Sequence, residues 1–189
     1  RRVLFRSRRI HKLEDENKAF DTRNTLQNEK KQASGRLRLQ METVLKVIET
    51  TINRHMSEIS DYVSQGKDNP PVLGIKEYNS YSFETPKDTG TGTNFKGMLI
   101  YDISILNSTA LPALAHDSLL FANVSDDTIG QILALYAREK QKQIFIAFDR
   151  ASKYDKMAQS IIRENTVLKL DADEQALFGR KWGRKDTAK

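Results

Sequence analysis

The chain has 189 residues, no cysteine, and a formal net charge of +6 at pH 7. The lack of cysteine excludes disulfide frameworks and thiolate metal sites, and it fits a reducing compartment. No apolar run approaches the length of a membrane span, so we expect a cytoplasmic protein without a membrane partner.

The first seven residues, RRVLFRS, resemble the in-frame translation of a widely used sequencing-adapter oligonucleotide. We interpret residues 1–7 as a read-through scar, and we expect the natural protein to continue upstream. Arg1, Arg2 and Arg6 supply three of the six net charges, which leaves +3 for the rest of the chain. That charge is too small to argue for nucleic-acid binding.

Residues 8 to about 64 are predicted to form a long helix, because they contain no proline and a single glycine, Gly35. Apolar residues recur there in steps of three or four, as on one helical stripe: Leu37, Met41, Val44, Ile48, Ile52, Met56, Ile59 and Val63. An amphipathic helix lying on its own domain is the alternative to a coiled-coil arm. Length favours the arm, since about 55 residues at ~1.5 Å each exceed the diameter of a small domain.

Gly66 and the run Lys67–Pro71 are expected to end this helix. Two short β-rich runs then surround Asn79 and Ser80, which predicts a hairpin. The turn DTGTGTN, residues 88–94, follows and opens a very apolar helix. Glycines let backbone N–H groups face an anion, and the helix dipole adds to the attraction, although such a turn is often only a turn.

This turn is not a P-loop. Gly92 and Gly97 have the glycine spacing of one, but Met98 follows where a phosphate-gripping lysine is required.

A predicted strand, residues 111–116, ends on Asp117. An acidic residue at that end of a buried strand is the usual Mg²⁺ ligand in nucleotide-hydrolysing α/β folds. We interpret the neighbouring His116 as a structural histidine, because adjacent strand residues point to opposite faces. Asp102, within the apolar helix, is interpreted as a hydrogen-bonded residue at a helix interface.

Downstream, Ser125 is a plausible N-cap of a helix that runs to about Lys140. Residues 144–148 predict a buried strand, residues 155–164 a helix, and residues 167–170 and 176–178 two further strands. Strands and helices that alternate at this spacing predict an α/β lobe with a mainly parallel sheet.

Three stretches of the sequence resemble a known protein family. The stretches GTGTNFKGMLIYDISIL, LPALAHDSLLF and LFGRKWG resemble an uncharacterised domain family at the C-terminus of bacterial SMC-like ATPases, over about residues 37–183. The resemblance implies residues 67–189 as the C-terminal lobe of a P-loop ABC-type ATPase head, with residues 8–66 as its coiled-coil arm. It also implies that the P-loop lies in an N-terminal half of the same protein, joined by an antiparallel coiled coil.

The resemblance assigns roles by position. Gly90, Thr91, Gly92 and Thr93 match a signature-like turn that contacts the γ-phosphate of ATP bound on a second head. Asp117 matches the Walker B aspartate, which helps to hold Mg²⁺. Asn123, Val124, Ser125 and Asp126 fall near the D-loop at the dimer interface. Phe148 falls near the switch histidine. ATP and Mg²⁺ are thus implied for the complete head, with the P-loop half, a second head, and DNA or an accessory protein as partners.

Two departures from the pattern bear on catalysis. Ser118 stands where a catalytic Glu is usual, and its hydroxyl is a poor general base. Phe148 cannot hydrogen-bond a phosphate. Either another carboxylate, Asp126, Asp127 or Asp149, positions the water, or ATP is hydrolysed slowly as a switch. We expect hydrolysis only when the chain is joined to the P-loop half.

Two other functions stay open. The first is a non-catalytic coiled-coil interaction module with a degenerate ATPase lobe, which Ser118 and Phe148 favour. The second is a metal-dependent nuclease that uses Asp117, Asp126 and Asp127, although the latter two sit where acidic residues offset a helix dipole. The basic run 180–185 fits a solvated terminus, with a DNA contact as the alternative.

Overall fold

The computed structural model describes residues 2–149, 151–170 and 175–176, and their side chains from residue 6 onward. The basic run 180–185 and most of the strand predicted at 176–178 lie outside these residues. The chain divides into two compact units, one of residues 1–51 with 73–83 and one of residues 52–72 with 84–189. The hairpin that follows the long helix thus belongs to the same unit as the arm.

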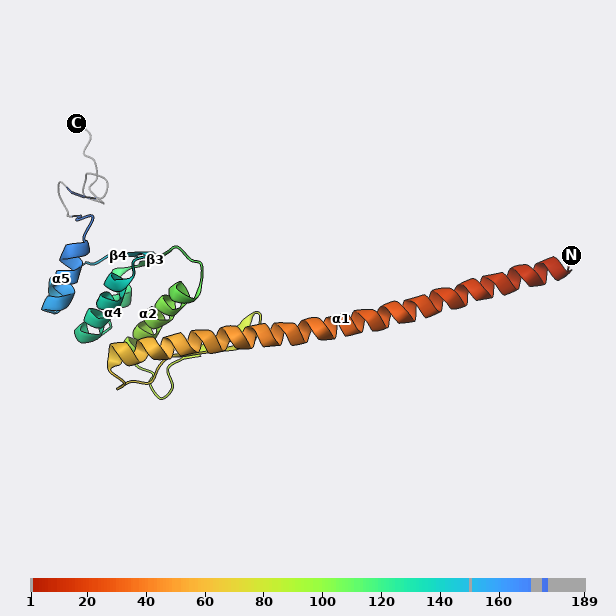
Figure 1. Cartoon of the computed structure of the whole chain (residues 1–189), viewed down its shortest axis with the longest axis horizontal. Helices are drawn as coiled ribbons and strands as arrows, with labels where there is room; N and C mark the ends of the chain where they lie inside the picture. The colour runs from red at the N-terminus through yellow and green to blue at the C-terminus, as the bar shows by residue number, and fades with distance from the viewer. Residues whose placement is uncertain (1, 150, 171–174, 177–189) are drawn as a thin grey trace, which may run out of the picture. The chain divides into compact units, whose positions relative to one another are not determined.

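The first unit consists of most of helix α1 and a hairpin. Helix α1, Arg2–Ser64, is continuous, which confirms the predicted long helix (Figure 1). Strands β1, Val72–Glu77, and β2, Ser80–Glu84, form the predicted hairpin. The Ile75 N–H of β1 donates to Glu49 of α1 at 2.7 Å, and Lys46 pairs with the same carboxylate at 2.6 Å. The hairpin is therefore hydrogen-bonded to the arm through a carboxylate on α1.

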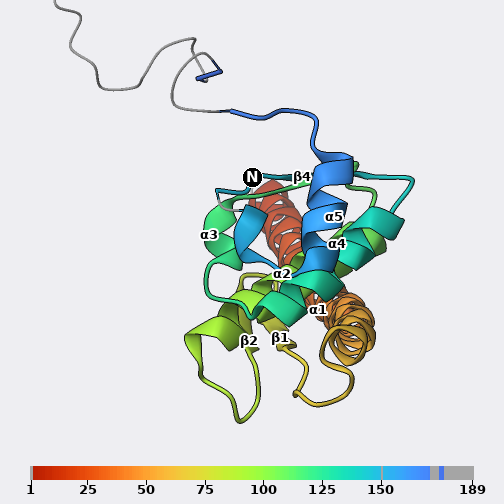
Figure 2. The same cartoon turned by 90° about the vertical axis from the view of Figure 1, so that its left-hand side faces the viewer.

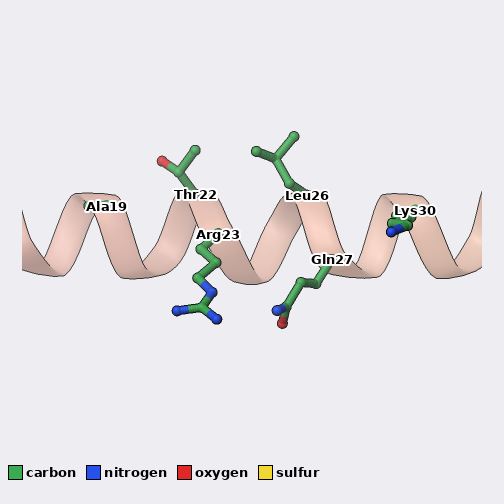
Figure 3. A pocket seen from close by; sticks show the side chains of 6 residues that line it. All are labelled: Ala19, Thr22, Arg23, Leu26, Gln27 and Lys30. Carbon is green, nitrogen blue, oxygen red and sulfur yellow. The ribbon is translucent and has the colours of Figure 1, made fainter.

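Much of the apolar stripe on α1 is exposed. Leu37, Met41, Val44 and Ile48 have exposed fractions of 58%, 37%, 57% and 41%. Nearer the N-terminus, a shallow hollow is lined by residues one helical turn apart, with Thr22 and Leu26 on one side and Arg23 and Gln27 on the other (Figure 3). This part of α1 is folded as a helix, but its apolar side chains are not packed within the first unit.

The second unit places helices on one face of a parallel strand pair. Its elements are α2 Thr91–Ser108, β3 Ala113–His116, α3 Ser118–Phe121, α4 Asp126–Arg138, β4 Gln143–Ile146, a 3₁₀ turn Ala151–Lys153 and α5 Lys156–Asn165. Strands β3 and β4 are parallel, with Ala113 opposite Gln143 and His116 opposite Ile146. Both views show α2, α4 and α5 on the same side of this pair (Figure 2).

The core lies between those helices and the strands. Leu99, Phe121, Ile129 and Ile132 are fully buried there, and Ile144 and Ile146 of β4 pack against them. The last turns of α1 join this core through Val63, so the end of the stripe is buried. Lys142, just before β4, donates hydrogen bonds to the carbonyl oxygens of Leu106 and Thr109 at the end of α2.

The opposite face of the strand pair is exposed and mostly apolar. Side chains alternate along a strand, so Leu114 and His116 point to the helices while Ala113 and Ala115 point away. Phe145 of β4 also points away and is 54% exposed. Among the described residues, this face of the parallel pair is therefore exposed, and Ala113, Ala115 and Phe145 lie on it beside Gln143.

The sheet differs from the prediction. A mainly parallel sheet with a strand at 167–170 was expected, but the described residues form two separate two-stranded sheets, the β1–β2 hairpin and the parallel pair β3–β4. Residues 166–170 have no regular structure, and Val167 is 96% exposed. The prediction failed because β-propensity becomes a strand only where a neighbouring strand accepts its hydrogen bonds.

Candidate functional site

Asp117 and Asp149 lie at the carboxyl ends of the two parallel strands, and Ser118 links them. Asp117 follows β3 directly and caps α3, with Oδ1 accepting from the Ser118 N–H at 2.7 Å. The Ser118 hydroxyl is 3.3 Å from the same Oδ1 and donates to Oδ2 of Asp149 at 3.0 Å. Parallel strands bring their carboxyl ends to one edge, so the fold itself assembles this exposed carboxylate–hydroxyl–carboxylate group.

Phe148 faces away from this group. Its ring packs against Phe121 with centroids 5.2 Å apart and against Tyr154 at 5.7 Å. The next residue, Asp149, is the one that reaches Ser118. Phe148 is therefore a partly buried residue that packs against the core, and Asp149 is the polar residue after β4 that reaches Ser118.

The glycine-rich turn is held by a carboxylate from its own chain. Asp88 accepts from the Gly90 N–H at 3.0 Å and from the Thr93 hydroxyl at 2.7 Å. The Thr93 hydroxyl, followed by the Gly90 N–H, holds the pKa of Asp88 below its ordinary value. A negative charge thus already lies at the positive end of α2, where the sequence suggested space for a phosphate.

Gly92 is required by a close approach within the lobe. A Cβ at this position would lie 2.6 Å from the carbonyl oxygen of Asn123, closer than real Cβ contacts. Asn123 belongs to the segment between α3 and α4 that was assigned to the D-loop. The structure therefore brings Gly92 against Asn123, and this internal packing is reason enough for a glycine there.

The start of α4 is separate from the Asp117 group in its hydrogen bonds. Ser125 is its N-cap residue and donates to the Thr128 hydroxyl at 2.7 Å, which confirms the predicted helix start. Asp126 and Asp127 lie in the first turn. The pKa of Tyr154 is raised, chiefly by burial and then by the charges of Asp126 and Asp149. Among the described residues, no group of three or more His, Cys, Asp or Glu could hold a metal ion.

His116 is the centre of a buried hydrogen-bond chain. Its Nε2 is 3.0 Å from Oδ2 of Asp102 on α2, and its Nδ1 is 3.0 Å from the hydroxyl of Tyr136 on α4. The side chain of His116 is 1% exposed and that of Asp102 33%. Burial, with a smaller effect from Asp102, raises the pKa of Tyr136, so its phenol remains protonated. The structural roles inferred for His116 and Asp102 are thus realised as one contact between them.

The sequence missed three of these relationships. Asp88 stands two residues before Gly90, the spacing at which an Asp side chain bonds its own backbone, and that signal was available. The Gly92–Asn123 approach and the Tyr136–His116 bond join residues far apart in the chain, and no local pattern marks them.

The overall arrangement is similar to that of SMC ATPase heads. One neighbour, from "Structural biochemistry of ATP-driven dimerization and DNA stimulated activation of SMC ATPases", has a TM-score of 0.53 and 14% identity over 71% of this chain and 84% of that chain. Another, "Crystal structure of the SmcHead bound to the C-winged helix domain of ScpA", has a TM-score of 0.50 and 16% identity over 64% of this chain and 39% of that chain. The fold is therefore similar to that of SMC ATPase heads.

A bacterial family accounts for most of the sequence. The model of the family described as "Uncharacterised protein conserved in bacteria (DUF2326)" matches residues 47–182, and the chain belongs to this family. A search of curated proteins finds no match. No helix among the described residues combines the length and apolarity needed to cross a bilayer.

Proposed function

We propose that the chain is the C-terminal half of an SMC-like ATPase head, which contributes the turn Gly90–Thr93 and Asp117 to ATP-dependent head dimerisation. One observation carries the proposal, namely the position of Asp117 at the carboxyl end of parallel strand β3, beside the end of β4, in a fold similar to SMC heads. In open α/β sheets, ligands bind at this edge.

The uncovered strand pair supports the idea of a missing half. Parallel sheets are normally covered on both faces, yet Ala113, Ala115 and Phe145 are exposed. An N-terminal half with the P-loop would extend the sheet and cover this face. Such a half would also supply the lysine that grips the β- and γ-phosphates.

The arm supports a partner helix. In a coiled coil, a knob residue enters a hole formed by four residues at i, i+3, i+4 and i+7. Ala19, Thr22, Arg23 and Leu26 have this spacing and line the hollow of Figure 3. The exposed residues of the stripe would then be buried by the ascending helix of the N-terminal half.

The chemistry of the site fits Mg²⁺ and ATP in the complete head. Magnesium prefers oxygen ligands and is usually held by one or two carboxylates and phosphate oxygens, and Asp117 would supply such a carboxylate. The bound ion would neutralise charge on the phosphates during transfer. Ser118 cannot serve as the general base, but Asp149 accepts its hydrogen bond at 3.0 Å and is the carboxylate best placed to orient water.

The test joins this chain to the P-loop half of the same protein. We expect Mg²⁺-dependent ATP binding, measured by calorimetry, and ATP-dependent association, measured by sedimentation. Asp117→Asn should weaken Mg²⁺-dependent binding, while the control Asp127→Asn, which removes an exposed carboxylate from α4, should not. This chain alone should not hydrolyse ATP. Turnover by the chain alone, or equal association with and without ATP, would overturn the proposal.

A non-catalytic interaction module remains the second candidate. Two observations favour it: Asp88 occupies the turn at the start of α2, and Gly92 is explained by packing on Asn123. A module of this kind would bind its partner equally well without nucleotide, and Asp117→Asn would leave that binding unchanged. DNA or an accessory protein is a further proposed partner in either case.

A further inference from the structure

We propose that His116 is a positioning residue that fixes the three segments of the proposed nucleotide site relative to one another, through Asp102 on one side and Tyr136 on the other. This inference rests on the proposed function, because that function assigns the three segments to a nucleotide site. The geometry that carries it is present in the chain itself.

The three elements joined at His116 each end at one of these segments. Helix α2 carries Asp102 and begins at the glycine turn, and α4 carries Tyr136 and begins just after Asn123. Strand β3 carries His116 and is followed directly by Asp117. Asp102 and Tyr136 lie ten or eleven residues into their helices, so each helix spans roughly 15 Å from the imidazole to its site segment.

The partners of the two ring nitrogens favour one tautomer of His116. The carboxylate of Asp102 can only accept, so Nε2 carries the hydrogen. Nδ1 then has a free lone pair and accepts from the protonated Tyr136 hydroxyl. A ring with its hydrogen on Nε2 and a lone pair on Nδ1 thus satisfies the hydrogen bonds of all three groups.

His116 is also fixed by its main chain and by its ring faces. Its carbonyl oxygen accepts from the Ala147 N–H at 3.0 Å, which continues the β3–β4 ladder. The imidazole meets the ring of Phe121 edge-on, with centroids 5.9 Å apart. A side chain held on so many sides has one orientation, so α2 and α4 cannot rotate about their axes independently of β3.

Helix α2 is held at two points, an arrangement that we call the clamp. Gly92 lies against Asn123 at the start of the helix, and Asp102 bonds His116 further along it. One point of contact would allow α2 to pivot, whereas two points fix its direction. The turn and the Asn123 segment are therefore expected to respond together when the His116 contacts are changed.

The first test uses this chain without nucleotide. Amide NMR shifts of Thr91–Thr93, Asp117–Ser118 and Asn123–Asp126 should change together in His116→Gln and in Tyr136→Phe. The control Ile103→Val, a buried α2 variant that lacks one methyl group, should leave them in place. If Tyr136→Phe changes only residues that touch position 136, the proposal is overturned, even where His116→Gln does not fold.

Coupling between Asp102 and Tyr136 gives a readout that simple loss of packing would not produce. Each substitution, at Asp102 or at Tyr136, changes the equilibrium constant for unfolding by some factor. The factor for the double variant should differ from the product of the two single factors by at least about threefold, although neither residue bonds the other. In a His116→Gln or, if that is unstable, His116→Asn background, the effects should multiply. The ring ¹⁵N shifts should show hydrogen on Nε2 alone. Multiplicative effects in the native background, or the opposite tautomer, would refute the positioning role.

These measurements separate this inference from the proposed function. If the clamp behaves as described and the reconstituted head binds no nucleotide, the ATPase proposal alone fails. If the head binds nucleotide but His116→Gln, Tyr136→Phe and Ile103→Val associate equally well with ATP, the positioning role alone fails.

Discussion

Gly92 lies against Asn123 and so joins two segments that the resemblance assigns to contacts with a second head. A Cβ at position 92 would lie 2.6 Å from the Asn123 carbonyl oxygen, a backbone atom that cannot swing aside. The glycine turn and the segment before α4 therefore pack as one surface. A partner that binds one of them will contact a surface whose shape depends on the other.

Gly92→Ala should destabilise the lobe by about 1–3 kcal/mol, because a backbone segment must shift to admit the methyl group. Gly90→Ala is the matched control: its Cβ would meet only side-chain oxygens, Asp88 Oδ1 at 3.3 Å and Thr93 Oγ1 at 3.5 Å. The control should cost less than about 1 kcal/mol, the usual effect of alanine at an N-cap. Urea unfolding of both variants measures the difference. Equal losses would contradict the close approach.

The stability of the glycine-rich turn should depend on the protonation of Asp88. Its folded-state pKa lies below the ordinary value of 3.8, because the Thr93 hydroxyl and the Gly90 N–H favour the carboxylate. The stabilisation is therefore fully present above pH 3.8 and is lost as pH falls through the lower folded value. The Gly90 amide shift should follow this titration and become insensitive to pH in Asp88→Asn. A midpoint at or above 3.8 would show that the hydrogen bonds are absent.

Hydrogen exchange should divide α1 into a labile and a protected part. Residues 8–33 expose their apolar side chains, among them Phe20 at 64% and Leu26 at 59%, whereas Ile52, Met56 and Val63 are buried. A helix without tertiary packing opens readily, so residues 8–33 should exchange fast and residues 52–63 slowly. Strong protection throughout residues 8–33 in a monomeric sample would contradict this. Adding the proposed partner half should slow exchange along the arm.

Removing Asp68 from its ion pair with Lys96 should lower the free energy of unfolding more than replacing Lys96 by an apolar residue. The N–O distance of this pair is 2.6 Å, and the Lys96 side chain is 10% exposed against 45% for Asp68. Asp68→Asn leaves a buried ammonium group without its counter-charge and should cost about 1–3 kcal/mol. Lys96→Met keeps the apolar stem without the charge and should cost less. Chemical denaturation of the two variants compares them, and a greater loss in Lys96→Met would refute the argument.

The elements could be predicted where local pattern sets the structure. The stripe from Leu37 to Val63 predicted α1, Asn79–Ser80 predicted the hairpin, and Ser125 predicted the start of α4. Residues 167–170 have the composition of a strand but no neighbouring strand among the residues that the structure describes, so local propensity misled there. A strand depends on what lies beside it, and the sequence of one segment does not contain that information.

The candidate site was predictable only in part, for a related reason. Asp117 could be found from its place after an apolar strand, and Asp149 was one of three carboxylates considered. That Asp149 reaches Ser118 depends on the register of β3 against β4, which is a property of the pair. The same holds for the bond between His116 and Asp102, since each residue was interpreted correctly but separately.

The hydrogen bond from Ile75 to Glu49 has a mechanical consequence. It ties the hairpin to the arm, so the chain passes between its two compact units three times, after residues 51, 72 and 83. Within the first unit, a pull along the arm therefore also loads the hairpin, because the Glu49 carboxylate carries part of the force into β1.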